Sequence, residues 1–101
     1  MGRKARQASS VGLYHVIVRG NNKGKLFHDG LDFEEFLKIL TEYLTQHPVQ
    51  IHHYCLMTNH VHLLLQAESL EALSRFMHGV QRSYHHYYRK HYTWFGRAIA
   101  S

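Results

Sequence analysis

Two histidines one residue apart, His60 and His62, stand at the start of a run of leucines in the segment CLMTNHVHLLL. In a β-strand, alternate side chains point to the same face, so both imidazoles would share one side, with their Cα atoms about 7 Å apart. That spacing lets two imidazoles converge on one divalent cation. The alternative is two ordinary residues on a wet sheet face, which is the commoner case for a His-x-His pair.

The kind of metal follows from the other available donors. A closed structural zinc site needs four ligands, and Cys55 is the only thiol in the chain. An open site of two histidines, one further donor and waters suits Mg²⁺ or Mn²⁺ engaged with a phosphate. His15, on the first predicted strand, would approach the same face if the two strands are neighbours. His52 and His53 are weaker candidates, because they point to opposite faces and one of them is expected to be buried and hydrogen-bonded.

Basic residues give the chain a net charge of +5 and a pI of about 9.6. Such a charge favours an anionic partner, most often nucleic acid, although a basic domain without such a partner is the alternative. The basic residues gather in three groups, at residues 3–6, 19–25 and 82–90. The candidates for contacts with DNA phosphates are Arg19, Lys23, Lys25, Arg82, Arg89 and Lys90.

Three strands are expected to position these side chains. Residues 12–19 are rich in β-branched and aromatic residues, which predicts a first strand. Residues 49–56 and 60–66 predict two more, joined by a short hairpin loop at 57–59. In the last strand the aliphatic side should meet the helices, which leaves the two histidines on the open face of the sheet.

Two helices complete the pattern. The first is expected to open at Asp32, whose spacing to Glu35 has the form of a capping box, and to end at Pro48, which cannot continue it. The second is expected to run from Ser69 to about Tyr92 with one apolar stripe.

The order strand, helix, strand, strand, helix indicates an α+β fold: a ferredoxin-like βαββα layer with an antiparallel sheet and two helices on one face. Residues 1–10 are polar and basic without periodicity and predict a flexible arm, so that one domain covers 11–101. A missing last strand leaves an exposed sheet edge, which invites pairing with a second copy.

The chain has 101 residues, no apolar run of 18 residues and no signal-peptide pattern. Its single cysteine cannot form an internal disulfide, and nothing indicates an oxidising compartment. We therefore expect a cytoplasmic protein without a membrane partner, in which Cys55 is a small core residue.

Four segments resemble one known family. YHVIVRGNNKGKLF at 14–27, LDFEEFLKILTEY at 31–43, YCLMTNHVHLLLQ at 54–66 and LSRFMHGVQRSYHHYYRKHY at 73–92 stand in order and at plausible spacing. They are similar to the HUH-class tyrosine transposases, and most of all to the REP-associated tyrosine transposases and their IS200-like relatives. The likeness covers about residues 11–92.

This resemblance implies a ferredoxin-like domain that binds single-stranded DNA beside a hairpin, usually as a homodimer. His60 and His62 match the family's metal pair, which holds Mg²⁺ or Mn²⁺. In the family a tyrosine hydroxyl attacks a DNA phosphate, giving a 5′-phosphotyrosine and a free 3′-OH, and the covalent bond keeps the energy needed for rejoining the strands in DNA transposition. The metal offsets the charge that the phosphodiester gains.

The chain departs from this pattern at its C-terminal end. The family's nucleophilic tyrosine lies on a further helix, four residues before an asparagine or glutamine, and no tyrosine here has that spacing. Residues 94–97, WFGR, resemble a remnant of the preceding strand, so the chain is expected to be a truncated or frameshifted copy. Tyr84 is the candidate for a substitute nucleophile, with Tyr88 on the same helix face, but its place on the apolar stripe favours a core aromatic. Tyr87 and Tyr92 are expected to stack on DNA bases.

Two rival functions remain. One is a non-catalytic module or regulator that recognises a DNA hairpin, which predicts salt-sensitive binding without strand cleavage. The other is a small structural or dimerising domain with no nucleic-acid role.

Overall fold

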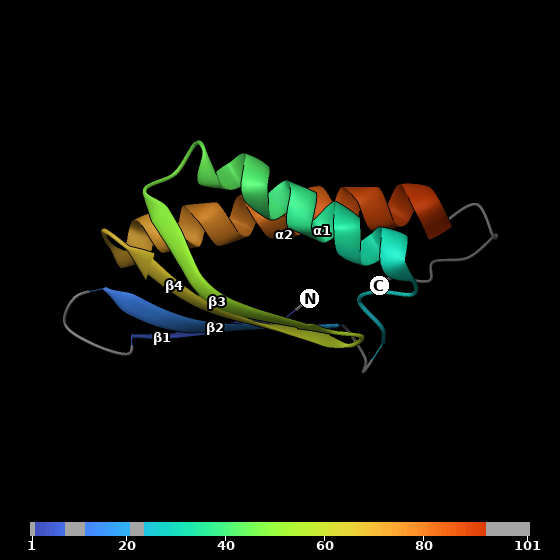
Figure 1. The fold of residues 1–101 in the computed structure, drawn as a ribbon, viewed down its shortest axis with the longest axis horizontal. Coiled ribbons are helices and arrows are strands. Elements are labelled where there is room, and N and C mark those ends of the chain that lie inside the picture. The colour runs from blue at the N-terminus through green and yellow to red at the C-terminus, as the bar shows by residue number, and fades with distance from the viewer. Residues whose placement is uncertain (1, 8–11, 21–23, 93–101) are drawn as a thin grey trace.

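The computed structural model describes residues 2–7, 12–20 and 24–92 of the chain. These residues form a four-stranded antiparallel sheet in the order β1-β2-β4-β3. Both helices cover the same face of this sheet, and the other face is left open (Figure 1). The elements, in chain order, are β1 (Gly2–Gln7), β2 (Leu13–Arg19), α1 (Gly30–Leu44), β3 (Val49–Met57), β4 (His60–Ala67) and α2 (Leu70–Tyr92).

The predicted α+β, ferredoxin-like layer is confirmed, with its antiparallel sheet and its two helices on one face. The strand β1 differs from the arm expected over residues 1–10, because Gly2–Gln7 pairs with β2 from Gly2 opposite Arg19 to Gln7 opposite Tyr14. An edge strand is held by backbone hydrogen bonds and needs no alternation of apolar residues, so the sequence of residues 2–7 did not predict a strand. The domain bounds of 11–101 stay a prediction.

One hydrophobic core lies between the sheet and the helices. Burial in β4 alternates strictly, with every second side chain buried. The core side chains of this strand are matched by Val16 and Val18 of β2, Phe36 and Leu40 of α1, and a long stripe of α2. Each fully buried aliphatic side chain contributes roughly 1.5–3 kcal/mol. This burial fixes the strand's orientation and so confirms that His60 and His62 lie on the open face.

Helix α1 begins one turn earlier than expected. Its N-cap is Asp29, whose side chain accepts the backbone N–H of Asp32 at 3.1 Å. Asp32 reaches back and accepts the N–H of His28 at 2.9 Å. The reciprocal cap therefore spans Asp29 and Asp32 instead of Asp32 and Glu35. The reason is tertiary, because the Asp32 carboxylate is buried against α2.

The turn between β3 and β4 is also shorter than expected. Met57 still pairs with His60, so only Thr58 and Asn59 form the turn. The loop after β2 is attached to this turn: the N–H groups of Leu26 and Phe27 donate to the Thr58 carbonyl, and that of Gly20 donates to the Asn59 carbonyl at 3.1 Å. Gly20 is required here, since a Cβ atom would lie 2.2 Å from the Gly24 carbonyl oxygen.

Candidate functional site

The rings of His60 and His62 lie together on the open face of the sheet. Their centres are 4.8 Å apart, with an angle of 78° between the ring planes. Two imidazoles bound at adjacent positions of one ion, with metal–nitrogen bonds of about 2.1 Å, have ring centres roughly 4.7 Å apart. Both side chains are partly exposed. The pair therefore suits two neighbouring positions around a single cation.

Two further side chains hold these rings. The Nδ1 atom of His60 lies 2.7 Å from Oδ1 of Asn59, and the Nδ1 atom of His62 lies 3.2 Å from Nε2 of His15. The ring of His15 stacks on that of His62 with centres 5.3 Å apart. The approach of His15 that the sequence predicted is thus confirmed. We call His15, Asn59, His60 and His62 the histidine cluster.

The electrostatics of the histidine cluster favour a neutral His62. Burial lowers the pKa of His62 below its usual value, and the nearby positive charges of His60, His15 and Arg19 lower it further. Arg19 is exposed and stands opposite His60 in the ladder between β2 and β4. A neutral imidazole keeps a lone pair for a metal, and Arg19 places a permanent positive charge beside the same site.

The donor set here is incomplete. Among the described residues, no group of three or more His, Cys, Asp or Glu side chains is arranged so that it could hold a metal ion. Two imidazoles fill part of the shell of Mg²⁺ or Mn²⁺, ions that keep several waters and bind phosphate oxygens. The residues present therefore fit an open site that is completed by waters and by phosphate oxygens, and the assignment of His60 and His62 stays a prediction.

Neighbouring residues of β3 differ from expectation. Cys55 is exposed and stands opposite His62, so its prediction as a core residue is wrong. The pairing register puts it on the open face, which its small apolar character alone could not show. His52 and His53 are both exposed, and the ring of His52 hydrogen-bonds to Gln66 instead of to the histidine cluster.

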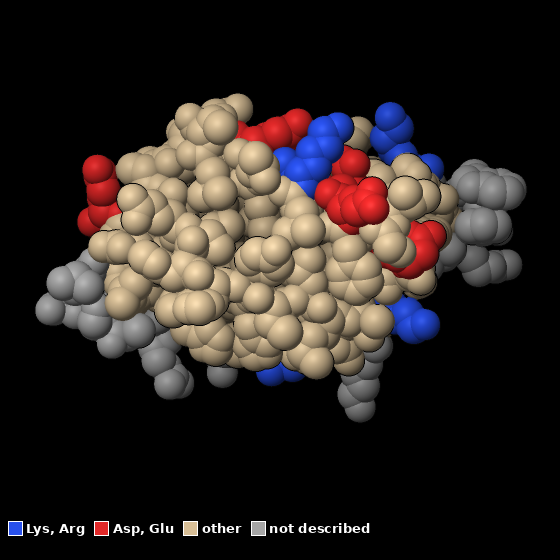
Figure 2. All heavy atoms as spheres, viewed as in Figure 1, with Lys and Arg blue, Asp and Glu red and all other residues tan. Residues whose placement is uncertain are grey.

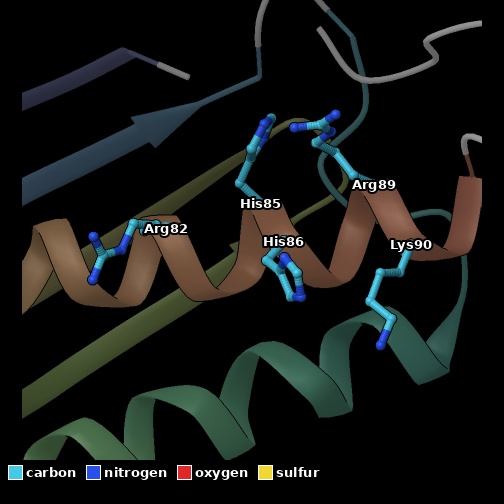
Figure 3. Close-up of a pocket in the computed structure, with 5 residues that line it drawn as sticks. All are labelled: Arg82, His85, His86, Arg89 and Lys90. Atoms are coloured by element: carbon cyan, nitrogen blue, oxygen red, sulfur yellow. The ribbon is translucent and has the colours of Figure 1, made fainter.

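A second basic surface lies on α2. A pocket of about 450 Å³ is lined by Arg82, His85, His86, Arg89 and Lys90, and Figure 3 shows that all five side chains come from this one helix. We call this set the α2 basic pocket. Burial lowers the pKa of His85, and the charge of Arg89 lowers it further. Over α1, by contrast, Lys and Arg side chains are interspersed with Asp and Glu (Figure 2).

The α2 basic pocket contains three of the six side chains predicted to contact phosphates. His85 and His86 were not predicted, although their spacing of three and four residues from Arg82 places them on neighbouring turns of the same helix. Of the remaining three, Arg19 and Lys25 are exposed, and Lys23 lies outside the described residues. No observation tests the nucleic-acid contacts of these six residues, which stay predictions.

Tyr84 lies apart from the histidine cluster. Its side chain is 1% exposed, its ring packs against Phe27 and Phe36, and its hydroxyl donates to the Leu26 carbonyl at 2.6 Å. Burial raises the pKa of Tyr84, and the nearby charge of Asp32 raises it further. The sheet separates this core position from the open face. The role of Tyr84 as nucleophile stays a prediction, and its burial favours the alternative of a core aromatic.

Two other tyrosines of α2, Tyr87 and Tyr92, contact a buried carboxylate that the sequence pattern indicated only as a helix start. Asp32 is 1% exposed and accepts hydrogen bonds from the hydroxyls of Tyr87 at 2.7 Å and Tyr92 at 2.6 Å. This arrangement favours a structural role for both tyrosines over stacking on DNA bases. We call His28, Asp32, Tyr87 and Tyr92 the Asp32 cluster. The sequence feature that could have indicated this cluster is the recurrence of tyrosine at positions 84, 87, 88 and 92.

Comparison with known proteins gives one result that bears on function. A family model described as "Transposase IS200 like" matches residues 8–100, and it confirms the resemblance that the motifs indicated. No curated protein matches the chain. None of the helices in the part of the chain that the structure describes is long and apolar enough to cross a membrane.

Proposed function

The chain belongs to the IS200-like transposase family, and we propose that it binds single-stranded DNA beside a hairpin, with Mg²⁺ or Mn²⁺ held by His60 and His62. The observation that carries this proposal is the pair of imidazoles 4.8 Å apart on the open sheet face. A transposase acts on DNA, and a partly exposed pair of imidazoles beside Arg19, with the pKa of His62 lowered by burial and by nearby positive charges, provides sites for a cation and for a phosphate.

In the family reaction a tyrosine oxygen forms a bond to phosphorus as the bond to the 3′ oxygen breaks. A bound divalent cation would offset the negative charge that the phosphate gains. His60 and His62 hold that ion, and Arg19 contacts a phosphate oxygen at the same face. The α2 basic pocket contacts further backbone phosphates through Arg82, Arg89 and Lys90.

A second candidate is a DNA-hairpin-binding module that does not cleave. The observation that favours it is the burial of Tyr84, whose hydroxyl is bonded to a backbone carbonyl within the core. Such a module keeps the salt-sensitive DNA affinity that basic contacts give. A covalent adduct between protein and DNA on a denaturing gel would exclude this candidate, and loss of that adduct in Tyr84→Phe would identify the nucleophile.

The metal assignment has a direct test. We expect the double variant His60→Ala with His62→Ala to lose Mn²⁺ binding in a titration followed by electron paramagnetic resonance. The matched control is His78→Ala, which removes an exposed histidine of α2 and should leave the affinity unchanged. Equal Mn²⁺ affinity in the double variant and the unaltered chain would contradict the assignment.

We also propose that the chain forms a homodimer. Strand β3 is the last strand in the sheet order next to β4, and its central residues 52–55 are exposed. An exposed edge strand offers backbone N–H and C=O groups to a second copy. Analytical ultracentrifugation should give twice the mass of the chain, and a single species of monomer mass at high concentration would refute the dimer.

A further inference from the structure

The two ring nitrogens of a neutral histidine have different roles. One carries a proton and the other a lone pair, and only the nitrogen with the lone pair can bind a metal. In the histidine cluster the Nδ1 atoms of both His60 and His62 already face a partner. The nature of that partner decides which nitrogen remains for a ligand.

The partner of His60 is Oδ1 of Asn59, at 2.7 Å. A carbonyl oxygen only accepts hydrogen bonds, so Nδ1 of His60 must donate its proton. Its lone pair then lies on Nε2. The partner of His62 is Nε2 of His15, at 3.2 Å, and either nitrogen of this pair could donate. Only donation from Nδ1 of His62 leaves its Nε2 atom with a lone pair.

We propose that His15 and Asn59 are positioning residues for the metal site, and that they hold His62 and His60 so that both bind the ion through Nε2. This inference rests on the proposed metal function. Histidine ligands in metalloproteins commonly donate their second ring nitrogen to an acceptor that fixes the tautomer and the ring orientation, and loss of such an acceptor weakens metal binding roughly 10- to 100-fold.

The backbone of Asn59 is itself held in place. Its carbonyl accepts the N–H of Gly20 at 3.1 Å. The preceding carbonyl, of Thr58, accepts the N–H groups of Leu26 at 2.6 Å and of Phe27 at 3.1 Å. Phe27 is buried in the core, so the turn that carries Asn59 is attached to a core residue.

His15 is held by the sheet. It lies on β2 opposite Leu64, one diagonal position from His62, whose own partner on β2 is Ile17. Diagonal neighbours on one face of a sheet are within reach of long side chains. The stacked rings, with an angle of 13° between their planes, keep Nε2 of His15 aimed at Nδ1 of His62.

The first test needs no metal. In the metal-free chain labelled with ¹⁵N-histidine, two-bond ¹H–¹⁵N correlation spectra above pH 7 report the tautomer of each ring. We expect His15, His60 and His62 all to carry the proton on Nδ1. A proton on Nε2 of His62 or of His60 would overturn the inference.

The second test measures Mn²⁺ affinity by electron paramagnetic resonance. His15→Ala and Asn59→Ala should each weaken binding about tenfold or more. His15→Gln and Asn59→Asp, which keep an acceptor oxygen, should restore most of the affinity, and His78→Ala, at an exposed position of α2, serves as the control. Unchanged affinity in both alanine variants would overturn the inference. No Mn²⁺ binding by the unaltered chain would overturn the proposed function, while the tautomers would still show whether His15 and Asn59 hold the rings.

Discussion

The Asp32 cluster and the histidine cluster are both polar, yet they face opposite environments. Asp32 is buried, and its carboxylate accepts three hydrogen bonds from groups of the same chain. In the histidine cluster, His60 and His62 each use one ring nitrogen for a hydrogen bond and stay partly exposed. A polar group whose bonds are completed inside the fold stabilises the fold, whereas a group with one site left towards solvent can bind a ligand.

The pKa values of the two clusters express the same difference. Burial by itself would raise the pKa of Asp32, but hydrogen bonds from Tyr92, the His28 backbone and Tyr87 outweigh it and lower the pKa below its usual value. Asp32 is therefore a charged group stabilised by donors of the chain itself. Burial and neighbouring positive charges lower the pKa of His62, so this group stays neutral at pH 7 and can act as a ligand.

Asp32→Ala should give the largest effect on stability. The substitution leaves two tyrosine hydroxyls and one backbone N–H without their buried acceptor, and we expect the free energy of unfolding to fall by about 3 kcal/mol. The double variant His60→Ala with His62→Ala should change it by less than about 0.5 kcal/mol, because these side chains lie at the surface.

Urea unfolding followed by circular dichroism measures both values. Glu34→Ala is the matched control for Asp32→Ala, since Glu34 is an exposed acid of the same helix. A larger loss of unfolding free energy in the histidine double variant than in Asp32→Ala would contradict the view that the Asp32 cluster stabilises the fold more than the histidine cluster does.

Tyr84→Phe should have an intermediate effect. The variant keeps the ring in the core but leaves the Leu26 carbonyl without its donor, which should cost about 1–2 kcal/mol of unfolding free energy. Tyr54→Phe, at a side chain that is 56% exposed, is the control and should change the stability by less than about 0.5 kcal/mol. A neutral result for Tyr84→Phe would show that its hydroxyl does not support the fold.

Acid should remove part of the stabilisation that Asp32 provides. Because the folded state lowers the pKa of Asp32, the resulting stabilisation is complete above the unfolded-state pKa of about 4. It is lost as the pH falls through that value towards the lower pKa of the folded state. This stabilisation amounts to about 1.4 kcal/mol for each tenfold decrease, on folding, in the affinity of the Asp32 carboxylate for its proton.

The measurement is the difference in unfolding free energy between the unaltered chain and Asp32→Asn at pH 7 and at pH 3. We expect this difference to be smaller at pH 3. A difference that is equal at both pH values would mean that folding does not lower the pKa of Asp32.

The alternation of β4 shows how much of the site the sequence could determine. Aliphatic residues at 61, 63 and 65 alternate with His60, His62 and Leu64, and the leucine-rich side had to enter the core. This alternation alone is enough to place the histidines on the open face. The motif around them likewise identified the family, since the four matching segments and their spacing are features of the sequence alone.

Other positions depended on partners that are distant in sequence. Asp29 and Asp32 both have the spacing of a helix cap. Asp32 instead lies within α1 and is buried, because its carboxylate accepts hydrogen bonds from the hydroxyls of Tyr87 and Tyr92 of α2. Cys55 was expected in the core, but the pairing of β3 with β4 puts it on the open face.

By itself the sequence determined the order of the elements from β2 to α2, the family and the face that carries His60 and His62, because these follow from local hydrophobic periodicity and from motifs. Only the tertiary structure decided what each polar atom contacts: Asn59 with His60, His15 with His62, and Tyr84 with the Leu26 carbonyl. The second and third of these contacts join residues that are 47 and 58 positions apart in the sequence. Their geometry follows from strand register and helix packing, which no local pattern contains.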